Sequence, residues 1–304
     1  MKKTIVKSIF IFCVILLIMV QIITFYSMAY RNSNIPELNQ STKNTILKLK
    51  KIHPQPENTI RIMTYNILSD EPGFEGSPAY TRANGVCSIL NNLSPDVIGV
   101  QEMSRSWFYY LKSNTQYSFV SPLKTAITSS MTAILYNPSN LILKNSGEKI
   151  LTKSTFQRLR KYIWATFETI DTGIAFTVVN THFSLNKNNS FAPPLQALEL
   201  IDFSKDFSEE HPVLFIGDFN TTQISNPNTD SGTVYGILSS FFTDTRNITK
   251  SLSEGGEKSS KASFVDHIFL KGNAEITNYI ILSNKEFAFF SDHYPILTDV
   301  IIKC

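Results

Sequence analysis

The sequence predicts an α/β fold in which stacked β-sheets are flanked by helices. Its 304 residues, 42% hydrophobic and 17% charged, suffice for the buried core of one large α/β domain. From Thr59 onward, runs rich in Val, Ile, Phe and Thr alternate with polar turns, helical stretches are few, and no internal repeat is present. Many strands with few intervening helices favour stacked sheets over a doubly wound parallel sheet.

An apolar segment near the N-terminus predicts export. It extends from Ile9 to about Phe25 and follows three lysines. Its length approaches the ~20 residues that span a bilayer and exceeds a typical signal-peptide core, so residues 1–30 are predicted to form a signal-anchor. A cleaved signal peptide is the alternative, because Ser27-Met28-Ala29 resembles a cleavage site, and a buried soluble helix is a third interpretation. Because the lysines should stay cytoplasmic, the rest of the chain is expected on the lumenal or extracellular side, membrane-anchored or secreted.

Residues 31–58 are predicted to be a linker. They are rich in Asn, Gln, Ser, Pro and Lys and lack strand alternation, which is typical of a tether. A short basic helix over Thr45–Ile52 at the membrane surface is the alternative to a solvated run of charge. Residues 59–304 then form one folded domain.

The folded domain is predicted to contain eight strands and three helices. The strands are Ile60–Tyr65, Val97–Gln101, Met131–Tyr136, Tyr162–Glu168, Ala175–Thr181, Val213–Ile216, Phe264–Leu270 and Ile296–Ile301. The helices are Tyr80–Leu93, Ser104–Lys112 and Leu195–Phe207. The last helix has the clearest signal, because Pro193 and Pro194 suit a helix start and apolar residues recur at helical spacing after them.

Charge is divided unevenly along the chain. The net charge is +3, yet residues 61–304 carry 20 Lys and Arg against 23 Asp and Glu. Proteins that grip duplex nucleic acid through many phosphates usually have an excess of Lys and Arg, because counterion release drives that binding. The composition therefore lowers the expectation of a DNA or RNA substrate.

Most of the polar side chains that could form a site lie at the ends of the apolar strands. They are Asn66, Glu102, His182, Asp218, Asn220, Asp266, Asp292 and His293. Such side chains can leave the core and enter a cleft, where binding and catalytic sites collect. Asp218 and Asn220 also project to the same side in extended chain. Each residue alone has a commoner structural explanation, such as a surface carboxylate or a turn cap, so the signal lies in their joint order.

The ordered motifs resemble those of the endonuclease/exonuclease/phosphatase superfamily. They are TYNI at 64–67, QE at 101–102, TH at 181–182, GDFN at 217–220, VDHIF at 265–269 and SDH at 291–293. Within the covered residues 60–304, Arg160–Ala165 is similar to an Arg-to-Trp-Ala strand of the bacterial-type hydrolases, and Thr132–Tyr136 to the strand before it. The resemblance implies a four-layer α/β sandwich of two mostly antiparallel sheets flanked by helices. His267 departs from the family's usual Tyr or Arg, and since Asp266 is kept we expect a change in packing more than in chemistry.

The resemblance also implies a divalent-metal-dependent phosphoesterase. Mg²⁺, with Mn²⁺ as the alternative, prefers hard oxygen ligands. Glu102 is expected to be the primary ligand, with Asn66 and Asp292 completing or supporting the site. Neither a Cys cluster nor an HExxH pair is present for zinc, and no bridge is expected between Cys87 and Cys304.

The other site residues are expected to handle protons and phosphate. The family pattern assigns water activation to Asp218, with Asn220 orienting the nucleophile and the phosphate. His293, paired with Asp266, is expected to act as general base or, when protonated, to bind a phosphoryl oxygen. His182 is expected to donate to the phosphate or to the leaving oxygen. The choice between Asp218 and His293 as the proton acceptor stays open.

Three substrate classes fit this site: a lipid head group, a small phosphoester or a nucleic acid. An exported, mildly acidic domain favours the first two over a nuclease. A catalytically inactive binding domain on the same sandwich is the alternative outside the enzyme class, and it is less favoured because the chain keeps every ionisable residue of the site. We expect a monomer that contacts a membrane through its N-terminal segment.

Overall fold

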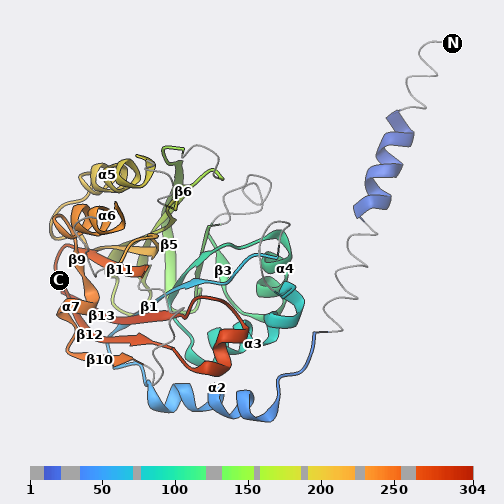
Figure 1. The fold of residues 1–304 in the computed structure, drawn as a ribbon, viewed down its shortest axis with the longest axis horizontal. Coiled ribbons are helices and arrows are strands. Elements are labelled where there is room, and N and C mark those ends of the chain that lie inside the picture. The colour runs from blue at the N-terminus through green and yellow to red at the C-terminus, as the bar shows by residue number, and fades with distance from the viewer. Residues whose placement is uncertain are drawn as a thin grey trace. The chain divides into compact units, whose positions relative to one another are not determined.

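The computed structural model describes residues 10–21, 35–70, 77–120, 132–153, 158–185, 191–222, 230–254 and 265–303 (Figure 1). The chain divides into two compact units, Met1–Glu37 and Leu38–Cys304.

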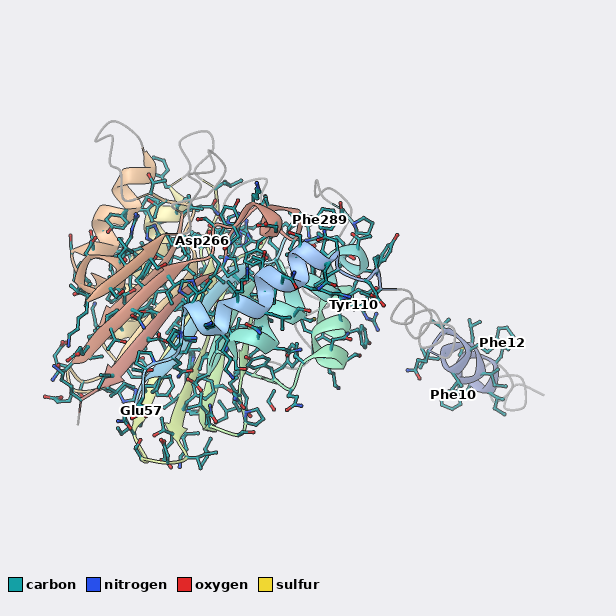
Figure 2. All side chains as sticks on the ribbon, turned by 90° about the horizontal axis from the view of Figure 1, so that it is seen from below. Phe10, Phe12, Glu57, Tyr110, Asp266 and Phe289 are labelled. Carbon is teal, nitrogen blue, oxygen red and sulfur yellow. The ribbon has the colours of Figure 1, made fainter. Side chains whose placement is uncertain are left out.

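Residues 10–21 of the first unit form a helix whose side chains are exposed. Phe10 and Phe12 project from it and are 69% and 66% exposed (Figure 2). Among the described residues, no helix is long and apolar enough to cross a membrane. The rest of the predicted signal-anchor, residues 1–9 and 22–30, lies outside the described residues.

The second unit begins with helix α2 (Gln40–Ile52), which the sequence assigns to a linker. The Asn39 side chain caps this helix by accepting a hydrogen bond from the Thr42 amide. Ile46 and Leu49 are buried, and α2 packs against α3 (Ala79–Leu93). The predicted linker is therefore wrong over residues 40–52: one helical face buries apolar side chains against α3, whereas the lysines on the other faces produced the tether-like composition.

Two mixed β-sheets form the centre of the unit. The first has the order β10-β12-β13-β1-β2-β4-β3 and the second the order β5-β6-β7-β8-β11-β9. The first comprises β1 (Ile60–Asn66), β2 (Val97–Gln101), β3 (Ser118–Phe119), β4 (Ala133–Tyr136), β10 (Ser251–Glu254), β12 (Ala274–Ile281) and β13 (Ile296–Ile302). The second comprises β5 (Leu141–Ile150), β6 (Lys161–Thr169), β7 (Ala175–His182), β8 (Val213–Asp218), β9 (Thr243–Asp244) and β11 (Asp266–Lys271).

Most neighbouring strands are antiparallel, but β1 with β2, β7 with β8 and β10 with β12 are parallel. Parallel strands end at the same edge of a sheet, so the last residues of β1 and β2 lie side by side, as do those of β7 and β8. This topology brings the polar strand ends of each sheet together.

Helices flank the two sheets, as the family resemblance predicts (Figure 1). Besides α2 and α3 they are α4 (Arg105–Asn114), α5 (Ala192–Ser204), α6 (Asp230–Ser239), α7 (Thr245–Ile248) and the 3₁₀ helix η1 (Lys285–Phe289). Apolar residues of α5 and α6 pack on β7, β8 and β11 to form one core. A second core lies between the sheets and includes Ile62, Val97, Val178 and Ile216.

The predicted strands and helices are recovered, with small differences at their ends. Met131 and Phe264, the first residues of two predicted strands, lie outside the described residues. The predicted helix Leu195–Phe207 runs from Ala192 to Ser204, because its two prolines occupy the first turn. The structure also contains elements that were not predicted: strands β3, β5, β9, β10 and β12, and helices α6, α7 and η1. Strand β5 is an edge strand with mostly exposed polar residues, so it lacks a clear apolar alternation.

Candidate active site

The predicted site residues converge from both sheets. Asn66 ends β1 and is paired in register with Gln101, the residue before Glu102. In the second sheet, Asp218 is in register with His182 on one side and with Asp266 on the other. The site is therefore built at the edge where strand ends of two different sheets meet.

The Asn66 amide joins the carboxylates of the two sheets. Its Nδ2 donates to Glu102 Oε1 at 3.3 Å and to Asp218 Oδ2 at 3.2 Å, while its Oδ1 accepts from the Leu68 amide. Glu102 Oε2 accepts from the Ser69 amide at 3.0 Å, and Glu102 itself has a φ of 61°. The left-handed backbone at a non-glycine residue stores strain that the surrounding structure must sustain. In this arrangement the Asn66 side chain points its N–H groups at the carboxylates of Glu102 and Asp218, whose oxygens are the potential metal ligands.

Asp218 is buried at the centre of the cluster. The backbone N–H of Asn220 donates to Asp218 Oδ1 at 2.9 Å, and the side-chain Nδ2 of Asn220 donates to the Phe183 carbonyl. Burial, together with the nearby charge of Asp266, raises the pKa of Asp218 to about 6, although His293 opposes that rise. Asp218 is therefore mostly ionised at neutral pH and close enough to its pKa to accept a proton.

His293 is hydrogen-bonded to Asp266 and faces Asp218. Its Nδ1 lies 2.7 Å from Asp266 Oδ2, and its Nε2 lies 3.8 Å from Asp218 Oδ2. Burial is the largest single effect and lowers the pKa of His293, but Asp266, Asp218 and Asp292 together outweigh it and raise that pKa to about 10. His293 is therefore a cation at neutral pH.

His182, unlike His293, is neutral at neutral pH. Its Nε2 lies 3.4 Å from Asp218 Oδ2. Burial, followed by the charges of Arg160 and His293, lowers the pKa of His182 well below its usual value. The two histidines beside Asp218 are thus a neutral donor and a cation.

Asp292 differs from the other predicted residues because it is exposed. The Ser291 hydroxyl lies 3.4 Å from Asp292 Oδ1 and donates to the Asn66 carbonyl at 2.6 Å, which places Asp292 beside the end of β1. Among the described residues, the potential ligand atoms that cluster within 4.8 Å belong to Asp218, Asp266 and His293. The predicted metal set of Asn66, Glu102 and Asp292 lies next to this cluster and does not coincide with it.

Arg160 is a site residue that the sequence reasoning used only as a strand marker. It immediately precedes β6, which pairs with β7 so that Tyr162 opposes Thr181. Burial lowers the pKa of Arg160, whereas the charges of Asp218 and Glu102 raise it. Its Nε is buried and has no hydrogen-bond partner among the described residues. The sequence signal was weak, since Arg160 precedes its strand, whereas most of the predicted polar residues follow theirs.

His267, the departure from the family pattern, lies on the other side of β11. Its Nδ1 is 3.2 Å from Asp244 Oδ2 and its Nε2 is 3.0 Å from the Thr221 carbonyl oxygen. Tyr235 also donates to Asp244. His267 therefore ties β11 to β9 and to the loop after Asn220, which is a packing role.

Comparisons with known proteins agree with this geometry. A model of the "Endonuclease/Exonuclease/phosphatase family" matches residues 63–293. Tyrosyl-DNA phosphodiesterase 2 of Rattus norvegicus is 25% identical over 167 residues, covering 55% of this chain and 43% of that protein. The chain therefore spans less than half the length of this curated relative.

Solved structures share the fold. An endonuclease/exonuclease/phosphatase protein from Bacteroides vulgatus aligns with a TM-score of 0.69 and 22% identity, covering 81% of this chain and 100% of that one. A mannosyl-6-phosphatase from Bacteroides thetaiotaomicron aligns with a TM-score of 0.66 and 18% identity, covering 79% and 99%. The family model covers most of the chain, and the chain belongs to the endonuclease/exonuclease/phosphatase family.

Proposed function

We propose that this protein hydrolyses a phosphoester bond with the help of Mg²⁺, or of Mn²⁺ as the alternative. The observation that carries the proposal is the geometry around Asp218: His182 Nε2 and His293 Nε2 lie 3.4 Å and 3.8 Å from its Oδ2, and Asp266 holds the His293 ring at 2.7 Å. A phosphoester needs a proton acceptor for water and positive charge for its phosphoryl oxygens. These residues supply both within one cluster.

The donor set fits a hard divalent cation. The carboxylates of Glu102, Asp218 and Asp266 offer oxygen ligands, and the described residues around them contribute no thiolate. We assign Glu102 as the primary ligand, with Asn66 and Asp292 completing or supporting the site. The ion, when bound, neutralises charge on the phosphoryl group.

Asp218 is the proton acceptor in our proposal. At neutral pH His293 already holds its proton, so it cannot accept another, whereas Asp218 is ionised. Water loses a proton to Asp218, its oxygen forms a bond to phosphorus, and the bond from phosphorus to the ester oxygen breaks. Asn220 orients the water and the phosphate. The charge states favour Asp218 over His293, the two acceptors between which the sequence leaves the choice open.

The two cations and the neutral histidine act on the phosphate. Protonated His293, held by Asp266, binds a phosphoryl oxygen. Arg160 adds a second positive charge beside Asp218 and Glu102. Neutral His182 keeps its proton and donates a hydrogen bond to the phosphate or to the leaving oxygen, and the leaving oxygen takes a proton from solvent as it departs.

The substrate is a phosphodiester or a phosphomonoester. The names of the relatives include both a tyrosyl-DNA phosphodiesterase and a mannosyl-6-phosphatase. The mild acidity of residues 61–304 favours a lipid head group or a small phosphoester over nucleic acid. A nuclease is the alternative within the enzyme class.

The N-terminal segment is proposed to attach the protein to a membrane. Residues 10–21 are helical and expose apolar side chains along their length, which favours an apolar environment around them. We propose that the second unit then lies on the lumenal or extracellular side, with a cleaved, secreted form as the alternative.

A hydrolysis assay tests the enzyme against the inactive binding domain. We expect the full-length protein to hydrolyse bis-p-nitrophenyl phosphate in the presence of Mg²⁺ or Mn²⁺. Addition of EDTA should stop this hydrolysis. Asp218→Asn should remove nearly all turnover, and the exposed Asp171→Asn should not. Absence of turnover with every divalent metal and across DNA, RNA, sphingomyelin and inositol phosphates would support the binding domain.

A further inference from the structure

Two buried amides connect the sheets directly beneath the site. Gln101 is the last residue of β2 in the first sheet, and Asn180 lies in β7 of the second. Gln101 Nε2 donates to Asn180 Oδ1 at 2.7 Å, and both side chains are fully buried. Asn180 Nδ2 in turn donates to the carbonyls of Val100 at 3.1 Å and Ala133 at 2.7 Å, both in the first sheet. The pair is a hydrogen-bonded link across an otherwise largely apolar interior.

This link is close to the site in the chain as well as in space. Glu102 directly follows Gln101, and His182 comes two residues after Asn180. Side chains two apart on a strand share a face, so Asn180 lies one layer below His182. Gln101 Nε2 also lies 3.1 Å from the hydroxyl of Thr64, which is two residues before Asn66. Each linked residue therefore adjoins a site residue.

The two buried amides occupy space between the sheets that apolar side chains could otherwise fill. A Cβ on Gly99 would lie 2.7 Å from Asn180 Oδ1 and 2.6 Å from Ile216 Cδ1, so only glycine lets the Asn180 amide reach the first sheet. Gln101 Oε1 is buried and has no hydrogen-bond partner among the described residues, which is unfavourable for stability. Apolar side chains of similar size would fill the space without that cost.

We infer that the hydrogen bond between Gln101 and Asn180 positions the two halves of the active site relative to each other. Glu102 and Asn66 belong to the first sheet, whereas His182, Asp218 and Asp266 belong to the second. A metal and a phosphate must contact groups from both, so the spacing between the sheets sets the geometry of the site. Gln101 and Asn180 are positioning residues, and the inference rests on the proposed function.

The test separates positioning from stability. Full-length Gln101→Met, Asn180→Leu and the double variant are compared with the wild type in Mn²⁺ and Mg²⁺ titration calorimetry and in thermal unfolding. We expect metal binding to weaken by about 10- to 100-fold in the single variants, as for other residues that orient ligands. In the double variant both amides are removed, so Tm should recover relative to Asn180→Leu while metal binding stays weak. If Asn180→Leu does not fold, Gln101→Met carries the test, because it leaves the Asn180 contacts with Val100 and Ala133 in place.

Thr177→Val is the matched control. Thr177 is also fully buried in β7, but its hydroxyl bonds Thr166 of the same sheet at 2.8 Å and His211 Nε2 at 2.9 Å. The Thr177→Val variant should have a lower Tm than the wild type and an unchanged metal Kd. A metal Kd within twofold of wild type in Gln101→Met and the double variant would overturn the inference, as would an equal loss in Thr177→Val. A wild type that binds neither ion would instead contradict the proposed function.

Discussion

His293 Nδ1 lies 2.7 Å from Asp266 Oδ2, and this contact joins the two sheets at the active site. Asp266 begins β11 of the second sheet, whereas His293 comes shortly before β13 of the first. The carboxylate fixes the ring and favours its protonated form, with a pKa of about 10. The contact therefore sets both the orientation and the charge of His293.

The charge states predict a bell-shaped dependence of kcat/KM on pH. Activity should rise as Asp218 loses its proton near pH 6, stay level, and fall as His293 loses its proton near pH 10. A pH series with a phosphodiester at saturating metal measures both limbs. An acidic limb below pH 4 would contradict Asp218 as the proton acceptor.

Asp266→Asn should move the alkaline limb to lower pH. Removing the carboxylate removes the attraction that holds the proton on His293, so its pKa falls, by about one to three pH units for a charge at this distance. The ¹H resonance of the His293 ring, followed by NMR through a pH titration, measures this directly. Asp171→Asn, at an exposed carboxylate, serves as the control and should leave both values unchanged. An unchanged pKa of His293 in Asp266→Asn would contradict the stabilisation of its protonated form by Asp266.

Asp218→Asn should stabilise the metal-free protein while it removes activity. The folded pKa of Asp218 is about 6 against an ordinary value of 3.8, so folding disfavours its ionised form. Stability is therefore lost as pH rises from about 4 to 6, and a neutral amide avoids that loss. We expect a gain on the order of 1 kcal/mol at neutral pH in EDTA, and none near pH 4. Thermal unfolding at the two pH values checks this, and a less stable variant at neutral pH would contradict it.

The positions of most site residues could be predicted from the sequence because they lie at the ends of apolar strands. Asn66 ends β1, Glu102 follows the last residue of the parallel strand β2, and Asp218 is in register with His182, so local patterns and topology agree. Their charge states could not be predicted, since the pKa of Asp218 depends on burial and on Asp266, which lies 48 residues away in the chain. The orientation of the Asn66 amide likewise depends on Leu68 and Glu102 together.

Helix α2, anticipated only as a short basic helix over Thr45–Ile52 at a membrane surface, and Arg160, used only as a strand marker, were misread for different reasons. Helix α2 buries only three residues, including Ile46 and Leu49, and its lysines dominate its composition. The amphipathic signal is therefore weak until α3 is in place. Arg160 comes near Asp218 and Glu102 because β6 pairs with β7 in one particular register, and strand pairing over this distance is not encoded locally.

Gly217→Ala should destabilise the protein and disturb the site. Gly217 has a φ of 143°, and an added Cβ would lie 2.1 Å from the Thr181 carbonyl oxygen, which is backbone and cannot rotate away. We expect a loss of about 2 kcal/mol or more in the free energy of unfolding. Gly236→Ala is the control, because it lies exposed in α6 with nothing near its added Cβ and should stabilise by roughly 0.5–1 kcal/mol. Denaturant unfolding of both variants decides, and equal stabilities would contradict the clash.

Arg160→Gln should reduce kcat/KM by about 10²-fold without unfolding the protein, because it removes a preorganised positive charge from the phosphate site. Arg160→Lys should recover only part of the activity, since an ammonium cannot bind two phosphoryl oxygens as a guanidinium does. Inorganic phosphate should also inhibit Arg160→Gln more weakly than the wild type. Lys144→Gln, which removes an exposed cation paired with Glu168, is the control and should leave kcat/KM unchanged.

Because Arg160 also lowers the pKa of His182, the Arg160→Gln variant should raise that pKa toward its usual value. Unchanged phosphate inhibition with an unchanged His182 titration would show that Arg160 serves packing alone.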